Sequence, residues 1–126
     1  MRIFKTRAFQ RWGLKAGVTD SSLLDAATNM ERGLVDADLG GNLFKQRVAL
    51  PGRGKSGSTR TLIATRFVGV LFFLYGFEKN ERENISAKEL HLYQRFAGEL
   101  LGLTEEQIVI ALATHTLMEL KNDPTN

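Results

Sequence analysis

Residues 43–82 read LFKQRVALPGRGKSGSTRTLIATRFVGVLFFLYGFEKNER and contain three strand-like segments in succession. In each segment, apolar residues either alternate with polar ones or run continuously, and turn residues separate the segments. The pattern predicts strands over residues 43–50, 60–67 and 70–77. Val68 and Gly69 form the predicted hairpin turn between the last two strands. Such short connections leave no room for a crossover, so we expect three antiparallel neighbours.

The same stretch concentrates positive charge. Its eight Lys and Arg side chains stand against two Glu side chains, a net charge of +6, whereas the whole chain carries only +3. A sheet surface with clustered cations predicts a polyanionic partner, such as the phosphate backbone of nucleic acid. The eight cations are Lys45, Arg47, Arg53, Lys55, Arg60, Arg66, Lys79 and Arg82.

Helical patterns surround the three strands. Residues 1–5 predict a short strand, and two helices follow, the second with an apolar stripe at Leu23, Ala27, Met30 and Leu34. Capping-box patterns at Ser86 and Thr104 begin two further helices, which predict a helical hairpin over residues 86–120.

The predicted fold class is therefore α+β: an N-terminal strand and two helices, a three-stranded antiparallel meander, and a C-terminal helical hairpin. The third strand is apolar on both faces, which predicts a central position, with helices on one face and another element shielding part of the other. The edge at which the N-terminal strand joins the sheet is not determined by these patterns.

Length and composition predict one domain over residues 1–126, with residues 86–120 as a C-terminal helical extension and residues 121–126 as a loose polar tail. The chain contains no cysteine, which excludes disulfides, thiol chemistry and a Cys/His zinc site. No apolar run is long enough to cross a bilayer. We expect a soluble cytoplasmic protein.

Alternation within the strands defines a candidate anion site. Lys45 and Arg47 share one face of their strand, and Arg60 and Arg66 share a face of the next. If the two faces coincide, four cations line one surface that an anion would stabilise, and a lysine among them becomes a candidate general base. The alternative is that these cations decorate edge strands and prevent aggregation.

Two connecting segments add further candidates. The segment PGRGKSGST at residues 51–59 contains three glycines together with Arg53 and Lys55, and glycine-rich backbone can direct amides toward a phosphate. Its spacing is not that of a P-loop, so we do not expect nucleoside triphosphate binding. Lys79 and Arg82 follow the third strand. The alternative for the glycine-rich segment is a solvated hairpin loop, and the alternative for the segment with Lys79 and Arg82 is an ordinary polar turn.

These features resemble the RelE/ParE superfamily of toxins from type II toxin–antitoxin systems, closest to its RelE-like and HigB-like branches. The order of elements carries the resemblance together with FKQRVALPGRGKSGSTRTLIATR at residues 44–66 and FFLYGFEKNERENI at residues 72–85. It covers most of residues 1–85.

The resemblance implies an enzyme, a metal-independent endoribonuclease (mRNA interferase) that enters the ribosomal A site, cuts mRNA during translation and thereby inhibits translation. In such enzymes the ribose 2′-hydroxyl attacks the adjacent phosphorus, and no cofactor takes part. The implied partners are the ribosome with its mRNA and a cognate antitoxin, a helix-turn-helix DNA-binding protein.

Matched by position, the resemblance gives Lys45 the role of candidate base, Arg47 that of phosphate clamp and Arg60 that of transition-state stabiliser. Lys79 and Arg82 would bind the backbone or protonate the leaving group. The sequence itself adds Arg53, Lys55 and Arg66 as candidate RNA-binding cations.

The chain also departs from the family pattern. Asn80 and Ser86 stand where RelE-type members have an arginine and a tyrosine, and the histidines of some HigB-type members are missing, which leaves the acid and base unassigned. Two other functions therefore stay open: a ParE-like inhibitor of DNA gyrase, and a noncatalytic RNA- or ribosome-binding module. Codon preference, oligomeric state and the role of the C-terminal hairpin stay open as well.

Overall fold

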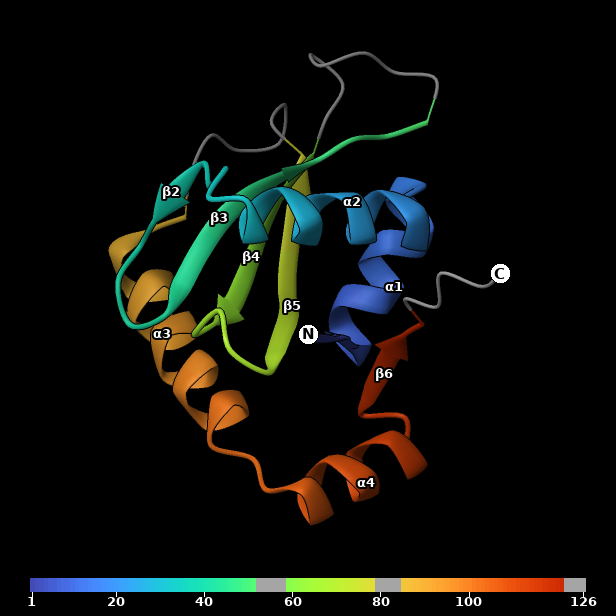
Figure 1. Cartoon of the computed structure of the whole chain (residues 1–126). Helices are drawn as coiled ribbons and strands as arrows, with labels where there is room; N and C mark the ends of the chain where they lie inside the picture. Colours follow the sequence, from blue (N-terminus) through green and yellow to red (C-terminus); the bar gives the residue numbers. More distant parts are fainter. Residues whose placement is uncertain (52–58, 79–84, 122–126) are drawn as a thin grey trace.

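The computed structural model of the protein describes residues 1–51, 59–78 and 85–121. These residues form an α+β fold with four helices and a six-stranded, mostly antiparallel sheet (Figure 1), which confirms the predicted class. The strands are β1 (Arg2–Thr6), β2 (Ala37–Asp38), β3 (Leu43–Val48), β4 (Thr59–Thr65), β5 (Val70–Glu78) and β6 (Leu117–Leu120). The helices are α1 (Arg7–Ala16), α2 (Asp20–Glu31), α3 (Ala87–Leu101) and α4 (Glu105–Ala113).

The sheet has the strand order β2-β3-β4-β5-β1-β6. The strands β3, β4 and β5 form the predicted antiparallel meander, and β5 occupies a central position, as its apolar sequence indicated. The N-terminal strand β1 pairs parallel with β5, with Ile3 opposite Leu71. Its other edge pairs antiparallel with β6. The first and last strands of the chain are therefore neighbours in the sheet.

The predicted helical extension over residues 86–120 is wrong in its last part. Both capping boxes form, at Ser86 and Thr104, but α4 ends at Ala113. His115 then adopts a positive φ of 58°, and the chain enters β6. A segment of only four residues has too few positions to distinguish a period of 2 from one of 3.6. Pairing with the open edge of β1 decides its conformation.

Three other predictions need correction. The helix α2 ends at Glu31, so Leu34 does not continue its buried stripe and is 61% exposed. The turn between β4 and β5 contains the four residues 66–69, not two, and includes Phe67 and Gly69 at positive φ. Helices also cover both faces of the sheet, because neither face of its central strands is polar.

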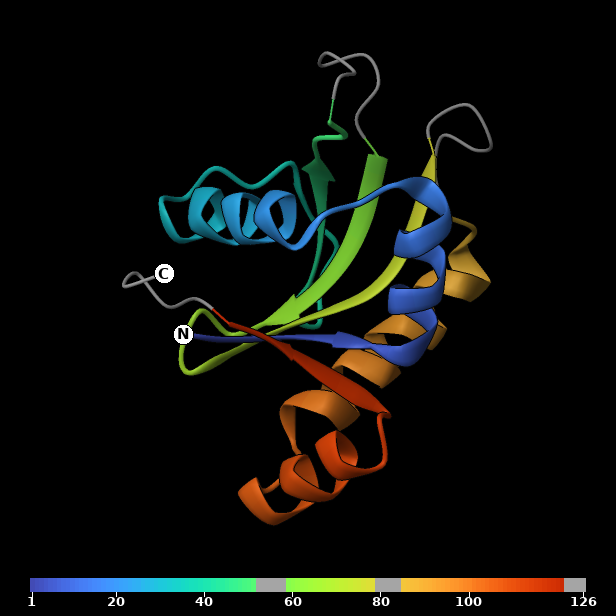
Figure 2. The same cartoon turned by 90° about the vertical axis from the view of Figure 1, so that its right-hand side faces the viewer.

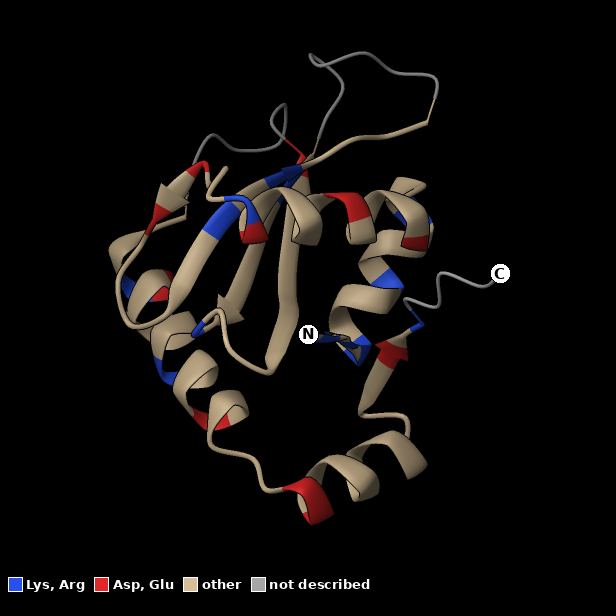
Figure 3. Cartoon of the chain, viewed as in Figure 1, with Lys and Arg blue, Asp and Glu red and all other residues tan. Residues whose placement is uncertain are grey.

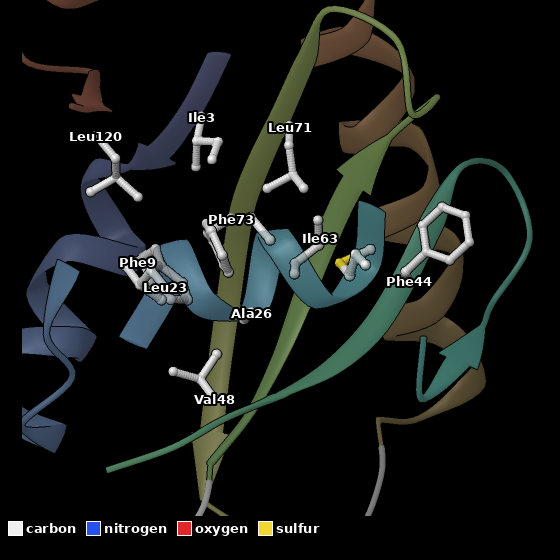
Figure 4. Close-up of a cluster of buried hydrophobic side chains, with 12 residues drawn as sticks. Ile3, Phe9, Leu23, Ala26, Phe44, Val48, Ile63, Leu71, Phe73 and Leu120 are labelled. Atoms are coloured by element: carbon white, nitrogen blue, oxygen red, sulfur yellow. The ribbon is translucent and has the colours of Figure 1, made fainter. Parts of the chain in front are cut away.

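One face, called here the α1/α2 face, packs against α1 and α2 (Figure 4). Trp12 of α1 lies directly over Gly76 of β5, and a Cβ atom at that position would overlap the indole ring. The glycine therefore permits the close approach of α1 to the sheet. The buried side chains of this core come from Ile3, Phe9, Leu23, Ala26, Ala27, Met30, Phe44, Val48, Ile63, Leu71, Phe73 and Leu120.

The opposite face, called the α3/α4 face, packs against α3 and α4, so α2 and α3 lie on opposite sides of the sheet (Figure 2). Phe4 and Phe72 stack in its centre with ring centroids 5.1 Å apart. Its buried residues are Phe4, Leu43, Leu62, Ala64, Phe72, Leu74, Ala97, Leu100, Ile108 and Leu117. In the described part of the chain, none of the helices has the length and apolar character that crossing a membrane requires.

Arg2 and Arg7, near the N-terminus, bond to residues of α4 and β6 and of the segment between them. Arg2 forms ion pairs with Glu105 of α4 at 3.1 Å and with Glu119 of β6 at 2.9 Å. The hydrogen bond from Arg2 lowers the pKa of the Glu119 carboxyl below its usual range. Arg7 donates to the backbone oxygens of Thr114 at 2.9 Å and His115 at 3.0 Å, where α4 ends. A guanidinium there satisfies carbonyl groups that a helix terminus leaves without partners.

Candidate nucleic-acid interface

Three of the predicted site residues share one face of the sheet. Arg47 of β3 lies directly opposite Arg60 of β4, and Lys45 lies opposite Leu62. Residues that face each other across a strand pair project to the same side, so Lys45, Arg47 and Arg60 all lie on the α3/α4 face. Figure 3 shows the basic segments along β3. We call these three residues the basic cluster.

The register sets the spacing within the basic cluster. Residues directly opposite each other have Cα atoms about 5 Å apart, and diagonal neighbours about 7–8 Å. Arg47 and Arg60 form the direct pair, and Lys45 lies on the diagonal from Arg60. These separations are short enough for three long cationic side chains to contact one phosphodiester group together.

Arg66 does not join the basic cluster. It lies beyond the end of β4, in the turn to β5, and its Nη1 donates to the backbone oxygen of Leu101 at 3.2 Å. Six residues of extended chain place Arg60 and Arg66 about 20 Å apart. The predicted surface of four cations therefore contains three, and Arg66 lies at the opposite end of the strand.

Apolar and aromatic side chains border the basic cluster on the α3/α4 face. Phe77 of β5 is opposite Arg60, and Tyr75 is opposite Leu62. Tyr75 stacks on Tyr93 of α3 with a centroid distance of 5.1 Å. Both tyrosines are partly buried against the apolar core. The cations are thus held at the margin of a packed core, which restricts the strands that carry them.

An acidic residue that the sequence did not single out contacts the basic cluster. The carboxylate of Asp36 accepts a hydrogen bond from the Arg47 backbone N–H at 2.8 Å and lies 3.6 Å from Arg47 Nε. Gln46 holds the same segment, since its side chain donates to the oxygen of Leu34 and accepts from the Asp36 N–H. A strand as short as β2 gives little periodic signal, so the sequence did not reveal this pairing.

The other four candidates, Arg53, Lys55, Lys79 and Arg82, lie outside the described residues. The described residues that flank their segments are informative. Thr59 is in register with Val48 on one side and with Glu78 on the other. Val48, Thr59 and Glu78 therefore lie at the end of the sheet that carries Arg47 and Arg60.

The arrangement suits an anion chemically. Like charges directly opposite each other on a sheet destabilise it, and a bound anion offsets that repulsion. Arginine offers a planar fork of N–H donors that matches two oxygens of a phosphate. Among residues 1–51, 59–78 and 85–121, no group of three His, Cys, Asp or Glu side chains is placed to hold a metal ion.

Comparison with known families decides the assignment. The model of the RelE family, described as the RelE toxin of the RelE / RelB toxin-antitoxin system, matches residues 1–120. The chain belongs to the RelE family. The match extends past α3 and α4 to the end of β6, so the C-terminal elements belong to the family region. No curated protein matches the sequence. As a RelE toxin, the chain pairs with a cognate antitoxin.

Proposed function

We propose that this RelE toxin is a metal-independent endoribonuclease that cuts mRNA on the translating ribosome, in the cytoplasm, and thereby inhibits translation. The observation that supports the proposal is the register of β3 and β4. It sets Arg47 directly opposite Arg60, with Lys45 on the same face. Because the RelE family consists of toxins, we infer that this cationic surface takes part in a toxic activity. That the chain belongs to the HigB-like branch of the superfamily remains a prediction.

The reaction forms one bond and breaks one. The ribose 2′-oxygen loses its proton and attacks the adjacent phosphorus, and the bond from phosphorus to the 5′-oxygen breaks. The products are a 2′,3′-cyclic phosphate and a 5′-hydroxyl end. Negative charge grows on the phosphoryl oxygens in the transition state, and fixed cations stabilise it there more than in the ground state.

Each residue of the basic cluster has a proposed part in this reaction. Arg47 clamps the scissile phosphate, and Arg60 stabilises the charge that develops on its oxygens. Lys45 is the candidate to accept the proton of the 2′-hydroxyl. Lys79 and Arg82, which lie outside the described residues, are proposed to bind the RNA backbone or return a proton to the leaving 5′-oxygen. Arg53, Lys55 and Arg66 are proposed to bind RNA.

The proposed partners are the ribosome with its mRNA and an antitoxin of the helix-turn-helix type. An antitoxin partner follows from the family, whereas its helix-turn-helix fold and the ribosomal target rest on the sequence resemblance. Binding to RNA through the basic cluster should weaken with salt, because each phosphate contact releases condensed counterions.

Transcript ends mapped after brief induction in growing cells test the proposal. We expect discrete cuts within coding regions that require translation, and we expect Arg60→Ala to abolish them while circular dichroism shows an intact fold. Arg11→Ala on the exposed surface of α1 is the matched control and should cut like the wild type.

Three outcomes would contradict the proposal. Toxicity that persists in a folded Arg60→Ala variant removes that residue from the mechanism. Inhibition of DNA gyrase without cut transcripts supports the ParE-like alternative. Salt-dependent binding to ribosomes without any new transcript ends supports a noncatalytic binding module.

A further inference from the structure

Two hollows lie along α3, apart from the basic cluster. The first, with a volume of about 370 Å³, opens between the last turns of α3, the start of α1, and the α4 and β6 segments. Apolar side chains make up most of its wall, and Arg7 and Glu99 contribute charge. Its apolar lining comes from Ala8, Phe96, Leu100, Leu103, Ala111 and Leu117.

The second hollow continues the first along α3. It has a volume of about 300 Å³ and is lined by Leu92, Tyr93, Arg95, Phe96 and Glu99. Phe96 and Glu99 line both hollows, so the two are adjacent along α3 and are considered together. We call the pair the α3 groove.

The apolar residues of the α3 groove follow the helix period. Leu92, Phe96 and Leu100 succeed one another on α3 at intervals of four residues. Such positions lie on one side of a helix. From Leu92 to Leu100 the stripe is about 12 Å long at 1.5 Å per residue, and Leu103 extends the apolar surface beyond the end of α3 at Leu101. That length matches about two turns of a second helix.

Part of this stripe is exposed to solvent. Leu92 is 60% exposed, and Phe96 and Leu103 are only partly buried. A contiguous apolar stripe of this kind marks a binding surface more often than an isolated exposed leucine does, because water contact with it carries a free-energy cost that a partner removes.

Charges at the rim of the α3 groove restrict which charges a bound partner can carry. Arg95 and Glu99 are both exposed, and neither forms an ion pair within the described ranges. Arg7 is engaged with the carbonyl groups at the end of α4. A partner helix that places an acid near Arg95 and a base near Glu99 would therefore gain charge complementarity as well as apolar burial.

We propose that the α3 groove is a docking surface for an amphipathic helix of the cognate antitoxin. Its apolar anchors would lie seven or eight residues apart, so that one fills each hollow. The identity of the partner rests on membership of the RelE family, in which toxins pair with antitoxins, and not on the proposed ribonuclease activity. The surface is separate from Lys45, Arg47 and Arg60, so the two proposals can fail independently.

Affinity for the antitoxin tests this proposal. The full-length toxin and the antitoxin of its own locus are purified, and their Kd is measured by titration calorimetry. We expect Leu92→Glu to weaken binding at least tenfold, as loss of a central interface contact does, and Glu99→Lys to weaken it to a smaller but measurable extent by reversing a rim charge. Ile110→Glu is the control, because Ile110 is equally exposed, at 62%, but lies on α4 outside the α3 groove. It should bind within twofold of the wild type.

Growth inhibition by each variant without the antitoxin is the second readout. Leu92→Glu should remain as toxic as the wild type, and it should resist neutralisation when the antitoxin is co-expressed. Unchanged affinity of both groove variants would overturn the proposal. So would a concentration-dependent dimer of the toxin that Leu92→Glu abolishes while antitoxin affinity stays normal, because the groove would then serve a second copy of the chain.

Discussion

Arg47 and Arg60 occupy directly opposed positions on β3 and β4, so two guanidinium groups project from one cross-strand pair. Paired residues of like charge destabilise a sheet, and the free energy is recovered when an anion binds between them. This relationship links the stability of the fold to occupancy of the candidate site.

Anions should therefore stabilise the folded protein. A ligand that binds only the folded state raises the melting temperature, and the shift grows with the logarithm of the ligand concentration relative to its Kd. We expect a short RNA oligonucleotide with 2′-deoxy substitutions, which cannot be cut, to raise the Tm of the wild type by several degrees in differential scanning fluorimetry. The Arg47→Ala variant should show less than half that shift. Equal shifts in both proteins would place the RNA elsewhere.

Asp36 should weaken RNA binding by partly neutralising Arg47. Its carboxylate lies 3.6 Å from Arg47 Nε, and both side chains are partly exposed. Exposed ion pairs contribute about 0.2–1 kcal/mol, so Asp36→Asn should tighten RNA binding about threefold at low salt. The asparagine can still accept the Arg47 backbone hydrogen bond.

Fluorescence anisotropy with a labelled RNA measures this change. Asp38→Asn is the matched control, since Asp38 is also exposed on β2 but accepts from the Gly40 backbone instead. An identical gain in affinity from both variants would attribute the effect to net charge and not to the contact with Arg47.

Gly76 should be essential for the packing of α1. An added methyl group would overlap the ring of Trp12, and overpacking a core costs about 1–3 kcal/mol. We expect Gly76→Ala to lower the free energy of unfolding by about 2 kcal/mol in urea titration. Gly98→Ala is the control, because no atom comes within 4 Å of a Cβ at that helical position, and this change should be neutral or stabilising.

Acid should loosen the attachment of β6. The hydrogen bond from Arg2 lowers the pKa of Glu119, so the pair contributes stability above the usual glutamate pKa of about 4.3. That contribution is lost as the pH falls through the lowered pKa of the folded state. We expect the wild type to lose more stability between pH 5 and pH 3 than Glu119→Gln does. Parallel pH profiles of the two proteins would contradict this.

The sequence predicted the meander and the four helices, and it named the three cations that share one face of the sheet. Alternation within β3 placed Lys45 and Arg47 together, but their relation to Arg60 depends on cross-strand register. Register is set by the turn and by packing, and the sequence of one strand does not contain it. The register shift in the β4–β5 pairing between Leu62 and Ile63 adds a further change of alternation that no pattern signalled.

What the sequence did not predict depends on contacts between distant segments. The strand β6 forms because β1 offers an edge more than a hundred residues away in the chain, and Arg2 then bonds Glu119. Arg66 was assigned to a strand because alternation does not show where a turn begins. Asp36 was not identified from the sequence, because its contact with Arg47 forms only in the folded protein. Each of these features is tertiary in origin.

The central claim is that Arg47 and Arg60 act on one phosphate. A double-mutant cycle of Arg47→Ala and Arg60→Ala, measured as the rate of mRNA cleavage on programmed ribosomes, tests it most directly. We predict strong coupling, with the double variant only slightly slower than the more damaged single variant. Rate losses that simply multiply, or a double variant that cuts at the wild-type rate, would contradict a shared phosphate site.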